Sequence, residues 1–185
     1  MVIGITGTIG AGKGTIVDYL VSEKSFEHFS VRDFLIEEIE RRGLPVNRDS
    51  MVIVANDLRA TFSPSYIIDQ LFERAVKSGK NAVIESIRAV GEIDSLRKSK
   101  EFVLFAVDAD IRKRYERIRQ RQSSTDNIDF DTFVENEKRE MTTTDPTKQN
   151  LSECIKKADY VFTNDKDIID LQNDVERVIN LLSFP

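Results

Sequence analysis

The segment Gly7–Thr15, which reads GTIGAGKGT, contains the residue types best suited to chemistry. Its glycines lack a Cβ, so the backbone can turn tightly and bring its N–H groups against a ligand. Lys13 adds a cation, and Thr15 adds a hydroxyl that suits Mg²⁺. The segment therefore predicts a phosphate loop that binds ATP with Mg²⁺. Its expected ATP-binding residues are Gly7, Gly10, Ala11, Gly12, Lys13, Gly14 and Thr15.

The flanking residues provide the setting that a phosphate loop needs. The apolar run Met1–Thr6 predicts a buried strand, and a helical pattern follows Thr15. A helix at this place directs its N-terminal N–H groups and its dipole toward bound phosphates. In the usual motif a serine or threonine directly follows the lysine, whereas here Gly14 intervenes and Thr15 takes the hydroxyl role.

A second group of candidate residues lies at the end of the apolar run Asn81–Ser86. This run predicts a buried parallel strand. Ligands of open α/β sheets lie beyond the carboxyl ends of the strands, so Glu85 and Arg88 are expected beside the phosphate loop. A carboxylate there can hold Mg²⁺ or its water shell, which makes Glu85 a candidate metal ligand together with Thr15. The guanidinium of Arg88 can bind a phosphate through two N–H groups.

The segment from Arg112 to Arg121 carries five arginines and one lysine against a single acid, Glu116. On a helix, Arg114, Arg117 and Arg121 fall along one stripe beside an apolar face. Phosphoryl transfer spreads negative charge over the moving group, and arginines that close over this group stabilise the charge and exclude water. The stripe therefore predicts the start of a lid, with a solvated basic face as the simpler alternative.

Strand-like runs alternate with helical patterns along the chain, which predicts an α/β fold with a five-stranded parallel sheet covered by helices on both faces. The predicted strands are Met1–Thr6, Phe26–Val31, Asn81–Ser86, Glu101–Asp108 and Tyr160–Thr163. A length of 185 residues suits one domain, built around the phosphate loop. Its expected parts are a core at residues 1–29, 79–109 and 142–185, acceptor-binding helices at 30–78 and a lid at 110–141.

Capping residues predict several helix boundaries. Ser63-Pro64 is expected to begin a helix, and Gly79 to end it. Asp110 and Asp129 are each expected to cap a helix, the second of which runs to about Met141.

The composition excludes several other kinds of site. The net charge of −5 argues against nucleic acid and anionic membranes as partners. A single cysteine, Cys154, excludes an internal disulfide, and with one histidine, His28, a zinc site is not expected. Because no apolar stretch is long enough to span a bilayer, we predict a cytoplasmic protein. The oligomeric state is left open by the sequence.

In these motifs the chain resembles the nucleoside monophosphate kinases, in particular the archaeal adenylate-kinase-like proteins that lie between adenylate kinases and dephospho-CoA kinases. The resemblance covers nearly the whole length and rests on short segments that occur in the family's order. These are Lys13-Gly14-Thr15, Ser30-Val31-Arg32-Asp33, Leu58-Arg59, the pair Glu85 and Arg88, and the ending from Ala158 to Asp165.

The resemblance also implies roles for single residues. It makes Arg114 and Asn164 ATP-binding residues, with Asn164 near the adenine, and it makes Asp126 an acidic residue of the lid. The implied acceptor-binding residues are Asp33, Arg59 and Arg88. The implied catalytic residues are Lys13, Arg88, Arg117, Arg121 and Arg139.

Three functions are consistent with these residues. The first is an ATP-dependent kinase for a nucleoside or deoxynucleoside monophosphate. The second is a dephospho-CoA kinase-like enzyme. The third is an ATP-binding regulatory or assembly protein with weak or no transfer. The third stays open because the sequence departs from the family in the acceptor motif and the lid, at Arg32, Ile36, Ser123 and Thr125.

Overall fold

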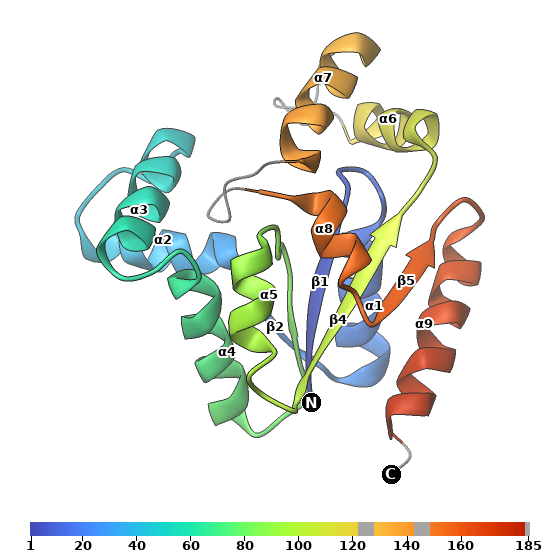
Figure 1. Ribbon diagram of the computed structural model, residues 1–185, viewed down its shortest axis with the longest axis horizontal. Coiled ribbons are helices and arrows are strands. Elements are labelled where there is room, and N and C mark those ends of the chain that lie inside the picture. The colour runs from blue at the N-terminus through green and yellow to red at the C-terminus, as the bar shows by residue number, and fades with distance from the viewer. Residues whose placement is uncertain (122–127, 143–148, 184–185) are drawn as a thin grey trace.

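The protein, as seen in a computed structural model that describes residues 1–121, 128–142 and 149–183, is built on a parallel sheet (Figure 1). Within these residues the sheet has five strands in the order β2-β3-β1-β4-β5. The strands are β1 Val2–Gly7, β2 Glu27–Phe29, β3 Ala82–Ile84, β4 Phe102–Asp108 and β5 Tyr160–Thr163. Each lies within one residue of a predicted strand or inside it, so the predicted fold class is confirmed.

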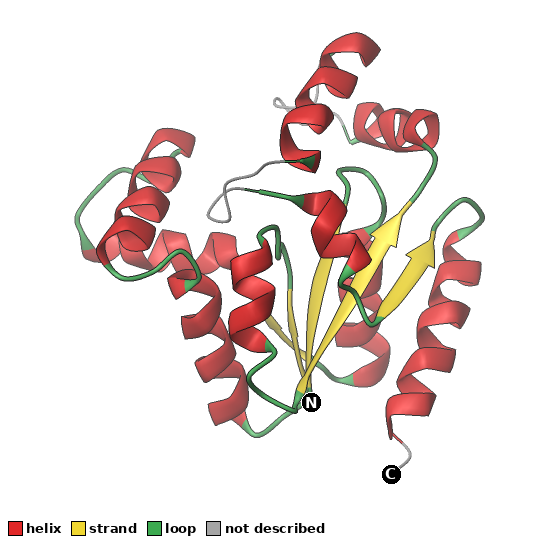
Figure 2. Ribbon diagram, in the orientation of Figure 1, coloured by secondary structure: helices red, strands yellow, loops and turns green. Residues whose placement is uncertain are grey.

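Helices cover both faces of the sheet (Figure 2). They are α1 Lys13–Lys24, α2 Val31–Arg41, α3 Arg48–Thr61, α4 Tyr66–Ser78, α5 Val90–Leu96, α6 Ile111–Gln120, α7 Phe130–Met141, α8 Leu151–Lys156 and α9 Ile168–Ser183. Alternate residues of each strand point to opposite faces, so the sheet contributes to two cores. One core packs under α2, α3, α4 and α5, and the other packs under α1 and α9.

The ends of the helices follow from their capping residues. The Asp110 carboxylate accepts the backbone N–H groups of Arg112 and Lys113, and Asp129 accepts that of Thr132, as predicted. Gly79 ends α4 with a φ of +68°. The predicted start of α4 at Ser63-Pro64 is wrong, because the helix begins at Tyr66 and these two residues lie in the preceding turn.

The carboxyl ends of the central strands lie between two projecting groups of helices (Figure 1). Helices α2 and α3 stand to one side of the sheet, and α6 and α7 lie over the ends of β1 and β4. The turn that joins β1 to α1, which is the predicted phosphate loop, opens toward this space. None of the described helices is long and apolar enough to cross a membrane.

Candidate active site

The phosphate loop depends on three glycines in left-handed conformations. The φ angles of Gly7, Gly10 and Gly12 are +142°, +77° and +108°. A Cβ on Gly7 would lie 2.1 Å from the carbonyl oxygen of Val107, and one on Gly10 would lie 2.6 Å from that of Arg114. The loop therefore needs glycine at these positions both for its dihedral angles and for its close approach to the neighbouring chain.

Replacing Gly12 by alanine is expected to lower the free energy of unfolding by about 1–3 kcal/mol and to weaken ATP binding. The new Cβ would take a strained φ and lie 2.3 Å from the amide nitrogen of Asn164. Gly14→Ala is the matched control, since Gly14 has no atom within 4 Å of an added Cβ and lies inside α1, where alanine adds about 0.5–1 kcal/mol of stability. Urea unfolding compares the two variants, and equal free energies would contradict this account of the loop.

Side chains from two neighbouring strand ends hold the loop in place. Thr8 donates its hydroxyl to Asp108 at the end of β4 (2.6 Å), and Asn164 after β5 donates its side-chain N–H to the Ala11 carbonyl (2.8 Å). Asn164 is buried beneath the loop. The Asn164 side chain thus contacts the loop that would bind ATP, and the placement of the adenine near Asn164 stays a prediction. Sequence reasoning missed Asp108, although its place at a strand end beside β1 was the available signal.

Lys13 folds back into the loop that it belongs to. Its ammonium donates to the carbonyl oxygens of Gly7 and Thr8, each at 2.8 Å. Burial lowers the pKa of Lys13 to about 8, and the positive charges of Arg88 and Arg121 act in the same direction. In the part of the chain that the structure describes, its hydrogen bonds go to carbonyls, so this buried cation gains a stronger partner when a phosphate enters the loop.

ATP binding is expected to weaken above pH 8, since Lys13 must be protonated to bind the phosphates. Arg88 and Arg121 lower its pKa, while Glu140 and Glu85 oppose that shift. Below pH 8 the ammonium is present before binding, and above pH 8 a proton must be taken up, so Kd rises by up to about tenfold per pH unit. Titrations of ATP between pH 7 and 9.5 measure this, and a constant Kd would contradict it.

The lowered pKa of Lys13 also makes the free energy of unfolding depend on pH. Lys13 titrates near pH 8 in the folded protein and near 10.5 when unfolded, so the unfolded chain binds the additional proton between these values. The contribution of Lys13 to the free energy of unfolding therefore rises with pH across this window. At neutral pH the buried charge of Lys13 destabilises the folded protein. Such a cost is typical of a residue that is retained for function.

Glu85 and Thr15 are the candidate ligands for a magnesium ion. Glu85 is half-buried, and its carboxylate lies 3.4 Å from Nε2 of His28, which with Lys13 and Arg88 holds the pKa of Glu85 below its usual range. Among the described residues no cluster of three acidic, histidine or cysteine side chains could hold a metal alone. Mg²⁺ commonly uses one or two protein ligands together with substrate phosphates, so the residues present fit it.

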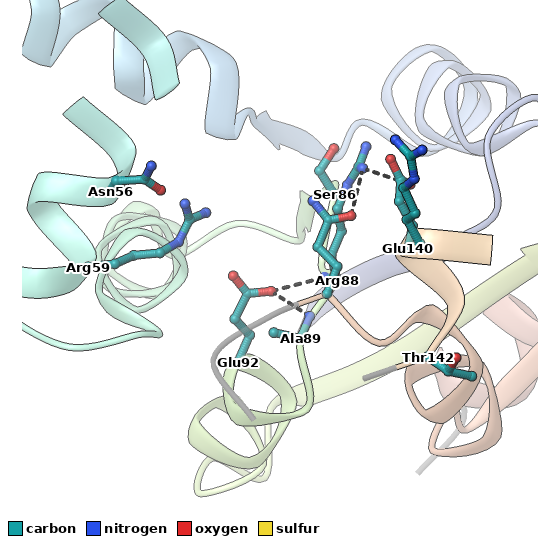
Figure 3. Close-up of a pocket in the computed structure, with 10 residues that line it drawn as sticks. Asn56, Arg59, Ser86, Arg88, Ala89, Glu92, Glu140 and Thr142 are labelled. Carbon is teal, nitrogen blue, oxygen red and sulfur yellow. Dashed lines mark hydrogen bonds and ion pairs between the residues drawn. The ribbon is translucent and has the colours of Figure 1, made fainter. Parts of the chain in front are cut away.

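A cavity of about 480 Å³ brings together three arginines that the sequence placed far apart (Figure 3). Arg59 comes from α3, Arg88 follows β3, and Arg139 comes from α7. The residues that line the cavity are Asn56, Arg59, Ser86, Arg88, Ala89, Glu92, Arg139, Glu140, Thr142 and Gln149. Three guanidinium groups around one hollow are suited to an anion, above all to a phosphate.

Among the residues that the structure describes, the Arg88 guanidinium has long contacts with two side chains. Its Nη1 lies 3.4 Å from oxygens of Glu140 and Gln149, which is long for a hydrogen bond. The backbone N–H groups of Arg88 and Ala89 instead donate to the buried Glu92 carboxylate at 2.9 and 3.1 Å. Burial raises the pKa of Glu92. The backbone is thus fixed while the guanidinium stays available to a ligand (Figure 3).

Sequence reasoning missed the residues that complete this cavity. Glu92 is the third residue of α5 and accepts the backbone N–H groups just before the helix, so a glutamate at this capping position was a usable signal. Asn56 lies one turn before Arg59 on α3, so helical spacing was a usable signal there. Ser86 also stands out, because its φ of +69° is uncommon for a residue other than glycine. Such strain is often retained where a backbone must approach a ligand.

The three arginines of the predicted lid stripe have different surroundings. Arg114 is buried and forms an ion pair with Glu137 of α7. Arg117 donates one Nη2–H to the carbonyl of Asn164 (2.9 Å), while its buried Nη1 has no hydrogen-bond partner among the described residues. Arg121 is exposed at the end of α6. Protein oxygens already occupy the guanidinium of Arg114, and its contact with ATP stays a prediction.

Two further predictions have other outcomes. Asp33 lies exposed in the first turn of α2 and is not among the residues that line the cavity with Arg59 and Arg88. The lid positions Ser123, Thr125 and Asp126 lie outside the described residues.

Comparison with known proteins agrees with this geometry. A family model for the AAA domain matches residues 3–145. The UPF0200 protein of Methanococcus vannielii is 30% identical over 169 residues, which cover 89% of this chain and 87% of the relative. The structure of TT1252 from Thermus thermophilus matches with a TM-score of 0.67 at 19% identity, and the match covers 99% of this chain and 98% of the TT1252 chain. Shikimate kinase from Aquifex aeolicus has a TM-score of 0.59 at 15% identity, covering 99% of both chains. The chain therefore belongs to the AAA domain family and to the UPF0200 proteins, with the fold of the P-loop kinases.

Proposed function

We propose that the protein transfers the terminal phosphoryl group of ATP to a small nucleotide, in the first place a nucleoside or deoxynucleoside monophosphate. The observation that carries this proposal is the cavity lined by Arg59, Arg88 and Arg139 beside a glycine-rich phosphate loop. The charges of Arg88 and Glu140, which both line the cavity, act on Lys13 of the loop, so the two sites are close neighbours. One site suits a triphosphate donor and the other an anionic acceptor.

In this proposal the protein works by positioning and by charge. The backbone N–H groups of the loop and Lys13 hold the donor phosphates, and Arg88 with Arg139 directs the acceptor's phosphate toward them. Arg117 and Arg121 lie on the α6 side and would neutralise charge on the moving group. When bound, Mg²⁺ supplies further charge neutralisation, and Thr15 and Glu85 are the residues that would hold it.

The acceptor's own chemistry favours a monophosphate over a hydroxyl compound. A nucleoside monophosphate is already anionic and needs no general base, whereas the ribose hydroxyl of dephospho-CoA must lose a proton. Among the predicted acceptor-binding residues Asp33 could serve as that base, yet it lies exposed and outside the cavity lining. The dephospho-CoA kinase-like function is therefore the second candidate. An ATP-binding regulatory protein is the third, and the cavity of arginines argues against it.

The proposal is tested by giving the purified protein ATP and Mg²⁺ with each of a panel of acceptors. The panel contains the ribo- and deoxyribonucleoside monophosphates and dephospho-CoA, and the phosphorylated product is measured directly by chromatography. A nucleoside diphosphate product supports the proposal, and a 3′-phosphorylated CoA selects the second candidate. Slow ADP release without a phosphorylated acceptor contradicts both and favours the third.

A further inference from the structure

A buried ion pair joins helix α7 to the phosphate loop. Arg114 of α6 is 4% exposed. It forms a bidentate ion pair with Glu137 of α7, in which Nη2 donates to Oε1 at 3.0 Å and Nη1 donates to Oε2. The same guanidinium donates Nε–H to the carbonyl of Ala109 at 2.8 Å and Nη1–H to that of Ile9 at 3.3 Å. Ile9 is part of the phosphate loop. One side chain thus connects α6, α7 and the loop.

The contacts of Arg114 continue into the rest of the loop. Its backbone carbonyl lies against Gly10, where an added Cβ would be only 2.6 Å away. Its Nε also lies 3.6 Å from the Asp108 carboxylate, which accepts the hydroxyl of Thr8. Arg114 therefore supports three consecutive residues of the loop. It donates to the carbonyl of Ile9, packs against Gly10, and lies near the carboxylate that accepts the hydroxyl of Thr8.

Glu137 links this support to the acceptor cavity. Arg139 and Glu140, which lie two and three positions further along α7, both line the cavity. Glu137 and Arg139 lie within one turn of the same helix, so the ion pair that fixes Glu137 also fixes the backbone position of Arg139. The ion pair between Arg114 and Glu137 thus contacts the phosphate loop on one side and lies within one turn of the cavity residues of α7 on the other.

We infer that Arg114 and Glu137 are positioning residues that hold the phosphate loop and Arg139 in one arrangement, so that donor and acceptor binding depend on a single ion pair. The part of this inference that concerns the acceptor rests on the proposed function. The part that concerns the loop requires only that the loop binds a nucleotide. Truncating one partner alone would leave an unpaired buried charge, whereas replacing both by apolar side chains of similar volume often leaves the fold intact.

The test uses the double variant Arg114→Met/Glu137→Leu and the single variant Glu137→Gln. Glu135→Gln is the matched control, because it removes one negative charge from an exposed position of the same helix. A fluorescent ATP analogue is titrated into each protein, with circular dichroism and thermal unfolding recorded alongside. We expect the double variant to stay folded and its Kd to rise by about tenfold or more, with a smaller rise for Glu137→Gln and none for Glu135→Gln. The KM of the accepted monophosphate should rise in the same order.

Unchanged Kd values in folded variants would overturn the inference. Should the double variant not fold, Glu137→Gln decides, since it keeps a hydrogen-bonding side chain of the same size. If the wild-type protein binds the analogue and the Kd values shift, but no acceptor is phosphorylated, the proposed function fails and the support of the loop stands. If transfer occurs and both Kd and KM stay constant, the proposed function stands and this inference fails. A wild-type protein that does not bind the analogue would overturn both.

Discussion

Replacing Lys13 by alanine is expected to lower the rate of phosphoryl transfer by about 10²–10³-fold or more. The ammonium is the cation that lies within the phosphate loop, where it is buried among carbonyl oxygens. Interactions with a developing charge are worth far more in such a water-poor place than in solvent. Single-turnover measurements with the accepted monophosphate report the chemical step directly.

The same substitution should leave the fold intact or make it more stable. Burial lowers the pKa of Lys13 to about 8, so at neutral pH the folded chain holds a charge that it would hold more easily in water. Removing the side chain relieves that cost, and the free energy of unfolding is expected to stay the same or rise. A lysine that stabilises the fold would show the reverse.

Lys77→Ala is the control for the loss of a lysine. Its side chain is 79% exposed on α4, and its contact with Glu73 at 3.8 Å is a surface ion pair. Neither transfer nor stability should change by a measurable amount. If Lys13→Ala kept full activity, the phosphate loop would not be where the donor binds.

The fold was predictable because its signals are local. Each strand is a short apolar run, and Asp110, Asp129 and Gly79 mark helix ends through contacts with residues close in sequence. The left-handed dihedral angles of Gly7, Gly10 and Gly12 are likewise the reason for the glycines that the motif shows. The start of α4 was missed because the turn at Ser63-Pro64 satisfies the same sequence signal as a helix start.

The site was predictable only in part, because its pairs are distant in sequence. The sequence singled out Arg59, Arg88 and Arg139, and the structure places all three around one cavity. The partner of Arg114 lies 23 positions away on a different helix, and no helical spacing marks an arginine as the buried member of an ion pair. Asn164 was selected through the family resemblance as a residue near the adenine, and no signal in the sequence indicated that its side chain donates to the loop carbonyl of Ala11. Residue type and spacing thus identified the site, but not which of its groups support others.

Replacing Arg88 by alanine is expected to raise the KM of the acceptor by about 10–10²-fold, the effect of losing one or two hydrogen bonds to a charged group. Within residues 1–121, 128–142 and 149–183 its guanidinium makes only long contacts of 3.4 Å with Glu140 and Gln149, so its loss should change stability by no more than about 0.5 kcal/mol. Steady-state kinetics with varied acceptor at saturating ATP measure the KM. An unchanged KM would exclude Arg88 from the acceptor site.

Two further variants show what the effect of Arg88→Ala depends on. Arg88→Lys tests the geometry of the guanidinium, and Arg41→Ala controls for the loss of one positive charge. Lysine keeps the charge but lacks the planar fork, so Arg88→Lys should give a KM between those of the wild type and Arg88→Ala. The Arg41 side chain is 72% exposed on α2 and pairs with Glu38, so Arg41→Ala removes an equal charge without reaching the cavity and should leave the KM unchanged. Arg88 also lowers the pKa of Lys13, so Arg88→Ala should in addition move the pH at which ATP binding weakens to a higher value. That second shift would occur only if the donor and acceptor sites are as close as the charges indicate.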